Sequence, residues 1–221
     1  LRYPIRMVFD GCALRLHFSN LTGTELVTLS KVYIEQTTVT FDGEKSVLIT
    51  GPLSRGQYAY GDHALEEELP ADDTRNTNWF YFLNTVDVLT KAENHAFICY
   101  GDSITAQSWP DDLAIRLWNE GIRNVAIIRR AVSGTRILRQ YDCITYAAYG
   151  LKGATRFPIE MEAAGADAVL IQHGINDIIH PVGVEVNKFR PWSDMPASAD
   201  LIAGVEDIYI QYAKEKGYKV Y

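Results

Sequence analysis

Three short apolar segments in the second half of the chain each end in a polar turn rich in small residues. The apolar segments are residues 96–100, 125–128 and 169–171. The turns that follow them are Gly101-Asp102-Ser103, Ser133-Gly134-Thr135 and Gly174-Ile175-Asn176-Asp177. Short apolar runs bounded by glycine are typical of buried strands, and the carboxyl ends of such strands form the ligand crevice of an open α/β sheet. We therefore expect the three turns to face one pocket.

A helix is expected after the first of these turns. Pro110 suits the first turn of a helix, and Asp111 and Asp112 interact favourably with its positive end. Leucine and tryptophan side chains recur at helical spacing behind them, and Gly121 is placed to end the helix.

Two more helices are expected further along the chain. Residues 159–164 predict a short helix ended by Gly165, and Ser198 is the expected N-cap of a longer helix that stops at Gly217. Alternating strands and helices predict an α/β domain with a parallel sheet. Residues 218–221 then open another strand that barely begins. We therefore expect the chain to be a fragment or one piece of a cleaved protein.

The first ninety residues show a different pattern, without helical periodicity. Period-2 alternation and hairpin signals mark the strands expected at residues 14–18, 32–34, 38–41, 46–49 and 79–88. We assign residues 1–90 to a small antiparallel β-sandwich and residues 91–221 to the α/β domain, with a short polar linker at 91–95.

Ser103 stands at the tip of the first turn, where its hydroxyl is a candidate nucleophile and its backbone N–H a candidate oxyanion donor. The structural alternative is a turn serine that caps a helix. The matching turns at Gly134 and Asn176 favour catalysis, although Asn176 also suits an ordinary turn. Thr105 occupies the last position of a G-x-S-x-G elbow, which disfavours the α/β-hydrolase fold.

These turns resemble the sequence blocks of the SGNH (GDSL-type) hydrolase superfamily. The resemblance implies that Ser103 is the nucleophile, and that its N–H, the Gly134 N–H and the Asn176 amide form an oxyanion hole. It covers residues 96–221 and implies a flavodoxin-like α/β/α domain. Residues 1–90 more loosely resemble the jelly-roll-like β-sandwich that precedes this domain in some bacterial esterases. The family's fourth block, an Asp-x-x-His near the C-terminus that supplies the catalytic base, is absent after the third block. A second chain or a missing segment is expected to provide it.

Other polar residues at the predicted edge are candidates for substrate binding. We assign Asp102, His173 and Asp177 to this group, with stabilisation of their own loops as the structural alternative for the two aspartates. Asp102 is not expected to orient a base on Ser103, because adjacent residues point apart. His180 is a competing candidate for the base.

Composition excludes several classes of function. A net charge of −7 without a basic cluster argues against nucleic-acid binding. No cysteine or histidine spacing suits a metal and no glycine-rich phosphate loop is present, so we expect no metal and no cofactor. The chain lacks an apolar run long enough to span a bilayer. Three unpaired cysteines and no visible signal peptide favour the cytoplasm, whereas a start without methionine leaves secretion open.

The sequence therefore predicts a serine carboxylic-ester hydrolase. The resemblance further implies short acyl groups such as acetyl, carried on a carbohydrate. An acyltransferase that uses the same serine is one alternative. A carbohydrate-binding protein with a degenerate hydrolase domain is the other.

Overall fold

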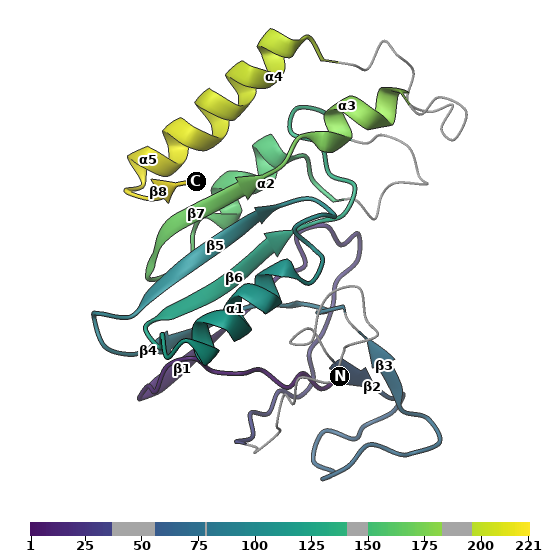
Figure 1. Cartoon of the computed structure of the whole chain (residues 1–221). Helices are drawn as coiled ribbons and strands as arrows, with labels where there is room; N and C mark the ends of the chain where they lie inside the picture. The colour runs from purple at the N-terminus through teal and green to yellow at the C-terminus, as the bar shows by residue number, and fades with distance from the viewer. Residues whose placement is uncertain (37–55, 78, 141–149, 183–195) are drawn as a thin grey trace. The chain divides into compact units, whose positions relative to one another are not determined.

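The structure is a computed structural model that describes residues 1–36, 56–77, 79–140, 150–182 and 196–221, with only the backbone of residues 180–182. The chain divides into two compact units, Leu1–Lys91 and Ala92–Tyr221, and each is described by itself (Figure 1). This division falls one residue after the boundary expected from the sequence.

Within the described part of Ala92–Tyr221, the central element is a parallel sheet of four strands in the order β6-β5-β7-β8. The strands are β5 (His95–Gly101), β6 (Val125–Ala131), β7 (Ala166–Gln172) and β8 (Lys219–Val220). The side chains of Ile98, Cys99 and Tyr100 on β5 are all 0% exposed. Consecutive buried residues are expected of a parallel strand covered on both faces. The predicted α/β unit with a parallel sheet is confirmed.

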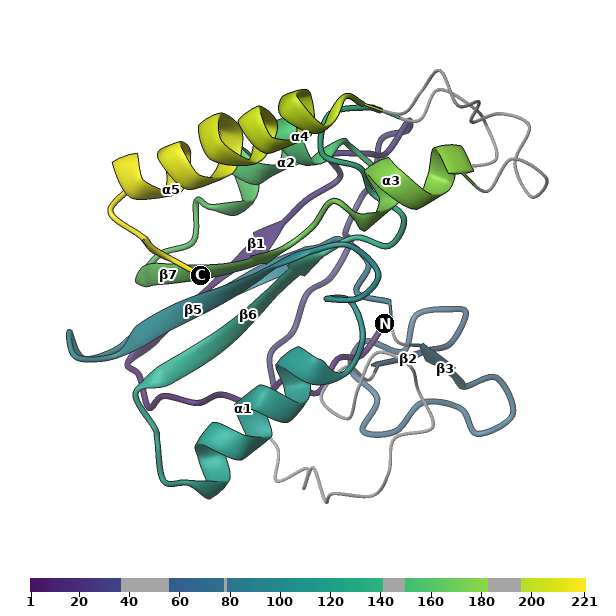
Figure 2. The same cartoon turned by 45° about the horizontal axis from the view of Figure 1, so that its top comes forward.

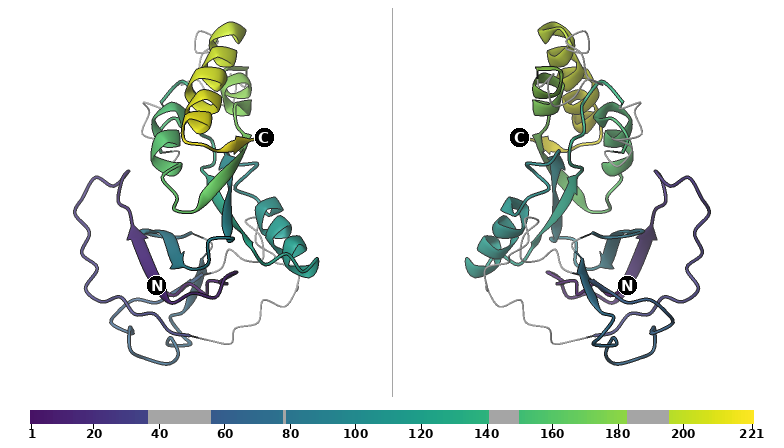
Figure 3. Two further views of the ribbon diagram at one scale, coloured as in Figure 1. Left: turned by 90° about the vertical axis from the view of Figure 1, so that its left-hand side faces the viewer. Right: turned by 90° about the vertical axis from the view of Figure 1, so that its right-hand side faces the viewer.

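Helices cover both faces of this sheet (Figure 2). The helical elements are α1 (Trp109–Asn119), α2 (Gly153–Glu160), α3 (Ile175–Val182), α4 (Ser198–Gly204), the π-helical segment η3 (Val205–Gln211) and α5 (Tyr212–Glu215). α1 lies on one face, and α2 and the α4–α5 run lie on the other, which Figure 3 shows from the sides. α3 continues from the carboxyl end of β7. None of the described helices is long and apolar enough to cross a membrane.

The main core lies between the sheet and the layer that contains α2 and η3. Tyr100 and Val169 from the strands pack in one cluster with Phe157 and Tyr209 from this layer. The ring centroids of Tyr100 and Phe157 are 4.8 Å apart in an edge-to-face arrangement. Such aromatic pairs contribute about 0.5–1.5 kcal/mol beyond the burial of their surface.

The helix expected after the first turn is confirmed as α1. It contains Pro110 in its first turn together with Asp111 and Asp112, and Gly121 follows it with φ +81°. A positive φ suits a residue without a Cβ, so the chain can leave the helix there.

Two expected helix boundaries are wrong. α2 spans Gly153–Glu160 and not residues 159–164. The sequence pattern did not indicate this helix, because it begins at a glycine and contains Pro158, two residue types that usually interrupt helices. Ser198 is the first helical residue and not the N-cap; Ala197 takes that position, without a side-chain capping bond. The long helix itself continues through α4, η3 and α5 and ends before Gly217, as predicted.

Within the described part of Leu1–Lys91, two antiparallel strand pairs are present. β1 (Ala13–Phe18) pairs with β4 (Leu83–Leu89), and β2 (Gly56–Tyr58) pairs with β3 (Arg75–Thr77). The strand expected from residue 79 begins only at Leu83, because Phe82 has φ +65° and interrupts the extended backbone.

The strand expected at residues 32–34 is also wrong. These residues are not in a strand, and Val32 and Ile34 are 49% and 62% exposed. Among the described residues no strand pairs with this segment, and alternation alone cannot form a strand without a partner. The hairpin expected at residues 38–49 lies outside the described residues, so the β-sandwich stays a prediction.

Candidate active site

Strand register places the three polar turns next to one another. Gly101, the last residue of β5, pairs with Ala131 on β6 and with Gln172 on β7. Because neighbouring strands lie about 4.8 Å apart, the three turns begin at adjacent positions, with the β5 turn in the middle. The first two turns carry Ser103 and Gly134. Asn176, expected in a third turn, instead lies in the first turn of α3, which begins at Ile175 just after β7. The structure thus brings the three predicted catalytic residues to one edge of the sheet.

The residues around Ser103 hold its turn in place. Asp102 is 1% exposed, and its Oδ1 accepts a hydrogen bond of 3.0 Å from the Ile104 N–H. The Asp102 carbonyl accepts a second bond of 2.9 Å from the Ala106 N–H. Ser103 itself is half-buried, and its hydroxyl has no hydrogen-bond partner among the described residues. The turn is therefore fixed by its neighbours, and no described residue engages the Ser103 hydroxyl.

Close packing explains the glycine that precedes this turn. A Cβ at Gly101 would lie 2.3 Å from the Gln172 carbonyl oxygen and 2.4 Å from Thr105 Oγ1. Real Cβ atoms do not approach other atoms so closely, so a larger residue would separate β5 from β7. Thr105 Oγ1 donates to Gln172 Oε1 at 3.2 Å, which joins the turn after β5 to the last residue of β7.

The second turn is anchored through Thr135, which is 1% exposed. Its N–H and its hydroxyl both donate to the Val132 carbonyl, at 3.3 Å and 2.8 Å. The Val132 N–H in turn donates to the Gly101 carbonyl at 3.2 Å. Gly134 has φ +78°, a conformation that glycine adopts without strain. The turn that carries Gly134 is therefore tied to the end of β5.

The start of α3 is hydrogen-bonded directly to the second turn. Asn176 is 3% exposed, and its Nδ2 donates to the Thr135 carbonyl at 3.0 Å. A carbonyl can only accept, so the amide nitrogen must face it. The second N–H of this amide has no partner among the described residues. One amide hydrogen of Asn176 is therefore not used by any described residue.

Asp177 joins the same two segments at a second point. Its carboxylate accepts the Ile137 N–H at 2.8 Å and the Leu138 N–H at 3.4 Å. Burial raises the pKa of Asp177, and these two backbone donors oppose the rise. Burial likewise raises the pKa of Asp102. Both aspartates bond to the backbone of neighbouring loops, and their predicted contact with substrate stays a prediction.

Arg156 on α2 is a buried residue of this region that the sequence analysis missed. It is 4% exposed, and its Nη2 donates to the Gly101 carbonyl at 2.9 Å. Its Nη1 lies 2.7 Å from Glu160 Oε2, and its guanidinium lies 4.5 Å above the ring of Tyr100. Burial raises the pKa of Glu160, and the charge of Arg156 opposes this rise. The signal that could have found Arg156 is its i,i+4 spacing to Glu160 in an otherwise apolar segment.

His173 bonds within the fold through both ring nitrogens. Its Nδ1 lies 2.8 Å from the Tyr209 hydroxyl, and its Nε2 lies 3.0 Å from both the carbonyl and the hydroxyl of Thr135. Burial, together with the charge of Arg156, lowers the pKa of His173 from 6.5 to about 4. The ring is therefore neutral at neutral pH. Its predicted contact with substrate stays a prediction.

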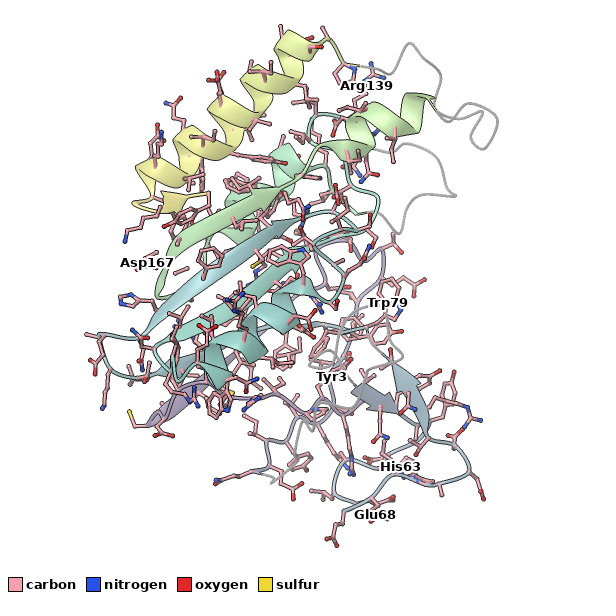
Figure 4. All side chains as sticks on the ribbon, viewed as in Figure 1. Tyr3, His63, Glu68, Trp79, Arg139 and Asp167 are labelled. Atoms are coloured by element: carbon pink, nitrogen blue, oxygen red, sulfur yellow. The ribbon has the colours of Figure 1, made fainter. Side chains whose placement is uncertain are left out.

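The other described histidine side chains lie elsewhere. His95, at the start of β5, pairs at 3.0 Å with Asp167 at the start of β7, which Figure 4 labels. Since a strand rises about 3.3 Å per residue, His95 lies roughly 20 Å from the β5 turn. His17 and His63 belong to the other unit. Among the described residues, no hydrogen bond joins a histidine ring to Ser103.

His173→Gln is expected to reduce the loss of folding stability that the protein shows on acidification. The pKa of folded His173, about 4, lies below its ordinary value of 6.5, so the unfolded chain takes up a proton between these values and the folded chain does not. Stability from this group is complete above pH 6.5 and falls by up to roughly 3 kcal/mol as the pH approaches 4. Urea unfolding of both proteins near neutral pH and near the lower pKa measures the difference. An equal fall in stability for both proteins would contradict the burial of a neutral His173.

No protein-family model matches the chain, and no curated protein matches its sequence significantly. The geometry of the three turns is therefore the basis for assigning a function.

Proposed function

We propose that this protein is a serine carboxylic-ester hydrolase of the SGNH (GDSL) type. Ser103 is the nucleophile. The backbone N–H groups of Ser103 and Gly134, together with the Asn176 side-chain amide, form the oxyanion hole. In this proposal the α/β unit is a flavodoxin-like α/β/α domain preceded by a β-sandwich in residues 1–90.

The observation that carries the proposal is the 3.0 Å hydrogen bond from Asn176 Nδ2 to the Thr135 carbonyl. An oxyanion hole needs donors that are fixed before negative charge develops, because the hole then needs no reorganisation during the reaction. This bond fixes one such donor against the turn that carries a second candidate donor. The turn of Ser103 begins between them, on the central strand of the three.

The proposed reaction has two stages. Ser103 Oγ attacks the ester carbonyl carbon while its proton passes to a general base, and the oxyanion donors stabilise the resulting tetrahedral intermediate. The bond to the alcohol oxygen then breaks, and the alcohol leaves with the proton from the base. Water attacks the acyl-Ser103 in the same way, which releases the carboxylic acid and regenerates the serine.

The general base comes from outside the residues that we have placed in the site. A serine hydroxyl is a weak nucleophile at neutral pH and needs an adjacent base. His173 uses both ring nitrogens within the fold, and His95 lies at the other end of the sheet. We place the base on an Asp-x-x-His segment supplied by a second chain or by a segment missing from these 221 residues. His180, whose side chain is not described, is the competing candidate.

Short acyl groups, with acetyl as the first candidate, are the proposed substrates. Ile104 directly follows Ser103, and Ile175 directly precedes Asn176; each isoleucine is 39% exposed. These residues add a small apolar surface next to the nucleophile and the oxyanion donor in the chain. A carbohydrate as the alcohol rests on the sequence resemblance alone, because a fold does not determine its substrate.

The test measures hydrolysis of p-nitrophenyl acetate, butyrate and octanoate, with imidazole added as an external base. We expect the acetate to react fastest. Product analysis with an added sugar acceptor then separates the two enzyme classes, because a hydrolase releases acetate and an acyltransferase forms the acetylated sugar. Sugar binding without acyl release from any of the three esters would contradict the proposal and indicate a carbohydrate-binding protein.

A further inference from the structure

A chain of hydrogen bonds leads from the core to the candidate oxyanion donor. It runs from Tyr209 through His173 and the Thr135 carbonyl to Asn176. We propose that His173, held by Tyr209 as its Nε2–H tautomer, is a positioning residue that fixes the Asn176 amide through the Thr135 carbonyl. The inference rests on the proposed function of Asn176 and names the residues that hold this donor in place.

The Thr135 carbonyl is the point where the chain of bonds meets the site. Asn176 Nδ2 and His173 Nε2 each lie 3.0 Å from its oxygen. A carbonyl oxygen has two lone pairs and cannot donate, so both nitrogens must present a hydrogen to it. An unprotonated Nε2 would instead direct its lone pair at the oxygen. With both nitrogens as donors, the acceptor capacity of the carbonyl is filled and its direction is fixed from two sides.

The remaining contacts select the tautomer. A neutral imidazole carries one proton, so a protonated Nε2 leaves Nδ1 as an acceptor for the Tyr209 hydroxyl at 2.8 Å. In the alternative arrangement, the Thr135 hydroxyl would donate to Nε2 at 3.0 Å. It would then give up its 2.8 Å bond to the Val132 carbonyl. The alternative would also leave the Nε2 lone pair 3.0 Å from the Thr135 carbonyl oxygen with no hydrogen between them, which the first arrangement avoids.

Tyr209 is held rigidly enough to impose this arrangement. Its side chain is 0% exposed, and its ring centroid lies 4.5 Å from that of Phe157 and 5.4 Å from that of Tyr100. The rings of Tyr209 and His173 are stacked with an interplanar angle of 10°. A Cβ at Gly153 would lie 1.9 Å from the Tyr209 hydroxyl and 2.7 Å from His173 Cε1. The glycine therefore provides the space in which the two rings meet.

The charged and titratable groups around His173 favour a neutral ring. Arg156 faces it from α2, and the Tyr100 ring lies 5.6 Å away on β5. Burial raises the pKa of both Tyr100 and Tyr209, so these phenols stay protonated and available as donors. Burial and Arg156 lower the pKa of His173, which agrees with a single ring proton.

The inference is tested first by nitrogen-15 NMR of the imidazole. We expect a protonated Nε2 and an unprotonated Nδ1 for His173, whose signals are assigned by their loss in His173→Gln. This measurement does not depend on catalysis. A protonated Nδ1 in the wild-type protein would overturn the inference.

The second test measures the rate at which p-nitrophenyl acetate acylates Ser103 with added imidazole. His173→Leu and Tyr209→Phe are each expected to lower the maximal rate roughly fivefold, with little change in the half-saturating ester concentration, since each removes about one net hydrogen bond from the positioning chain. His173→Gln keeps an amide donor for the Thr135 carbonyl and is expected to retain the rate. A merely structural role would not be rescued in this way. Unchanged acylation in His173→Leu would overturn the inference.

A third readout separates this inference from the proposed function. If the wild-type protein shows no acylation that depends on Ser103, the proposed function fails. The Asn176 side-chain amide resonances still decide the positioning role, because they should shift in His173→Leu and stay close to wild type in His173→Gln. Resonances that do not shift in His173→Leu would overturn the inference.

Discussion

Ser103→Ala is expected to lower protein-dependent hydrolysis of p-nitrophenyl acetate by at least about 10³-fold. Without the hydroxyl no acyl-enzyme forms, and only the oxyanion donors and binding remain; removing the nucleophile of a serine hydrolase can cost roughly 10⁶-fold in turnover. The measurement follows the release of p-nitrophenolate with imidazole added. Hydrolysis by imidazole alone is subtracted.

Ser108→Ala is the matched control for this substitution. Ser108 directly precedes α1, and its side chain makes no capping hydrogen bond to the helix. Its loss should leave the rate within about twofold of wild type, because the substitution removes no capping bond from α1. A folded Ser103→Ala protein that keeps more than a few per cent of the wild-type rate would show that another group performs the reaction.

Asn176→Ala is expected to lower the maximal rate by roughly 100- to 1,000-fold, the usual effect of removing one oxyanion donor. The half-saturating ester concentration should change much less, because the donor acts mainly on the charge of the transition state. Steady-state kinetics with the same ester and imidazole measure the two parameters separately.

The control for this variant must distinguish catalysis from folding. Asn119→Ala removes an exposed amide at the end of α1 and is expected to leave both kinetic parameters unchanged. In Asn176→Ala the Thr135 carbonyl still accepts the His173 Nε2–H, so the turn keeps one of its two anchors. Circular dichroism and thermal unfolding should show a folded protein. A folded Asn176→Ala protein that loses less than about threefold in rate would exclude Asn176 from the oxyanion hole.

The parallel sheet could be predicted because its strands are buried on both faces. The apolar run that became β5 has few other stable placements, and the residues that start and end α1 act locally. Elements whose limits depend on distant contacts were placed wrongly. α2 begins at Gly153, where a Cβ would clash with Tyr209 and His173, and neither residue is close to it in sequence. The break at Phe82 likewise depends on a backbone conformation that side-chain alternation does not reveal.

For the candidate site, the sequence predicted the position of the three candidate catalytic residues but not the residues that hold them. Ser103, Gly134 and Asn176 each follow a strand within a few residues, so parallel register brings them to one edge. The residues that hold them were not predictable by pattern. Arg156 and Tyr209 reach the site from helices that pack on the sheet, and helical periodicity alone marks such residues only as core.

The most direct test of the central claim is to locate the acyl group on the protein. The wild-type chain is mixed with p-nitrophenyl acetate and imidazole, quenched in acid, digested and mapped by mass spectrometry. We predict an acetyl group on the peptide that contains Ser103, formed with the kinetics of p-nitrophenolate release and absent from Ser103→Ala. An unmodified Ser103 while hydrolysis proceeds, or acetylation spread equally over other serines, would contradict the assignment of Ser103 as the nucleophile.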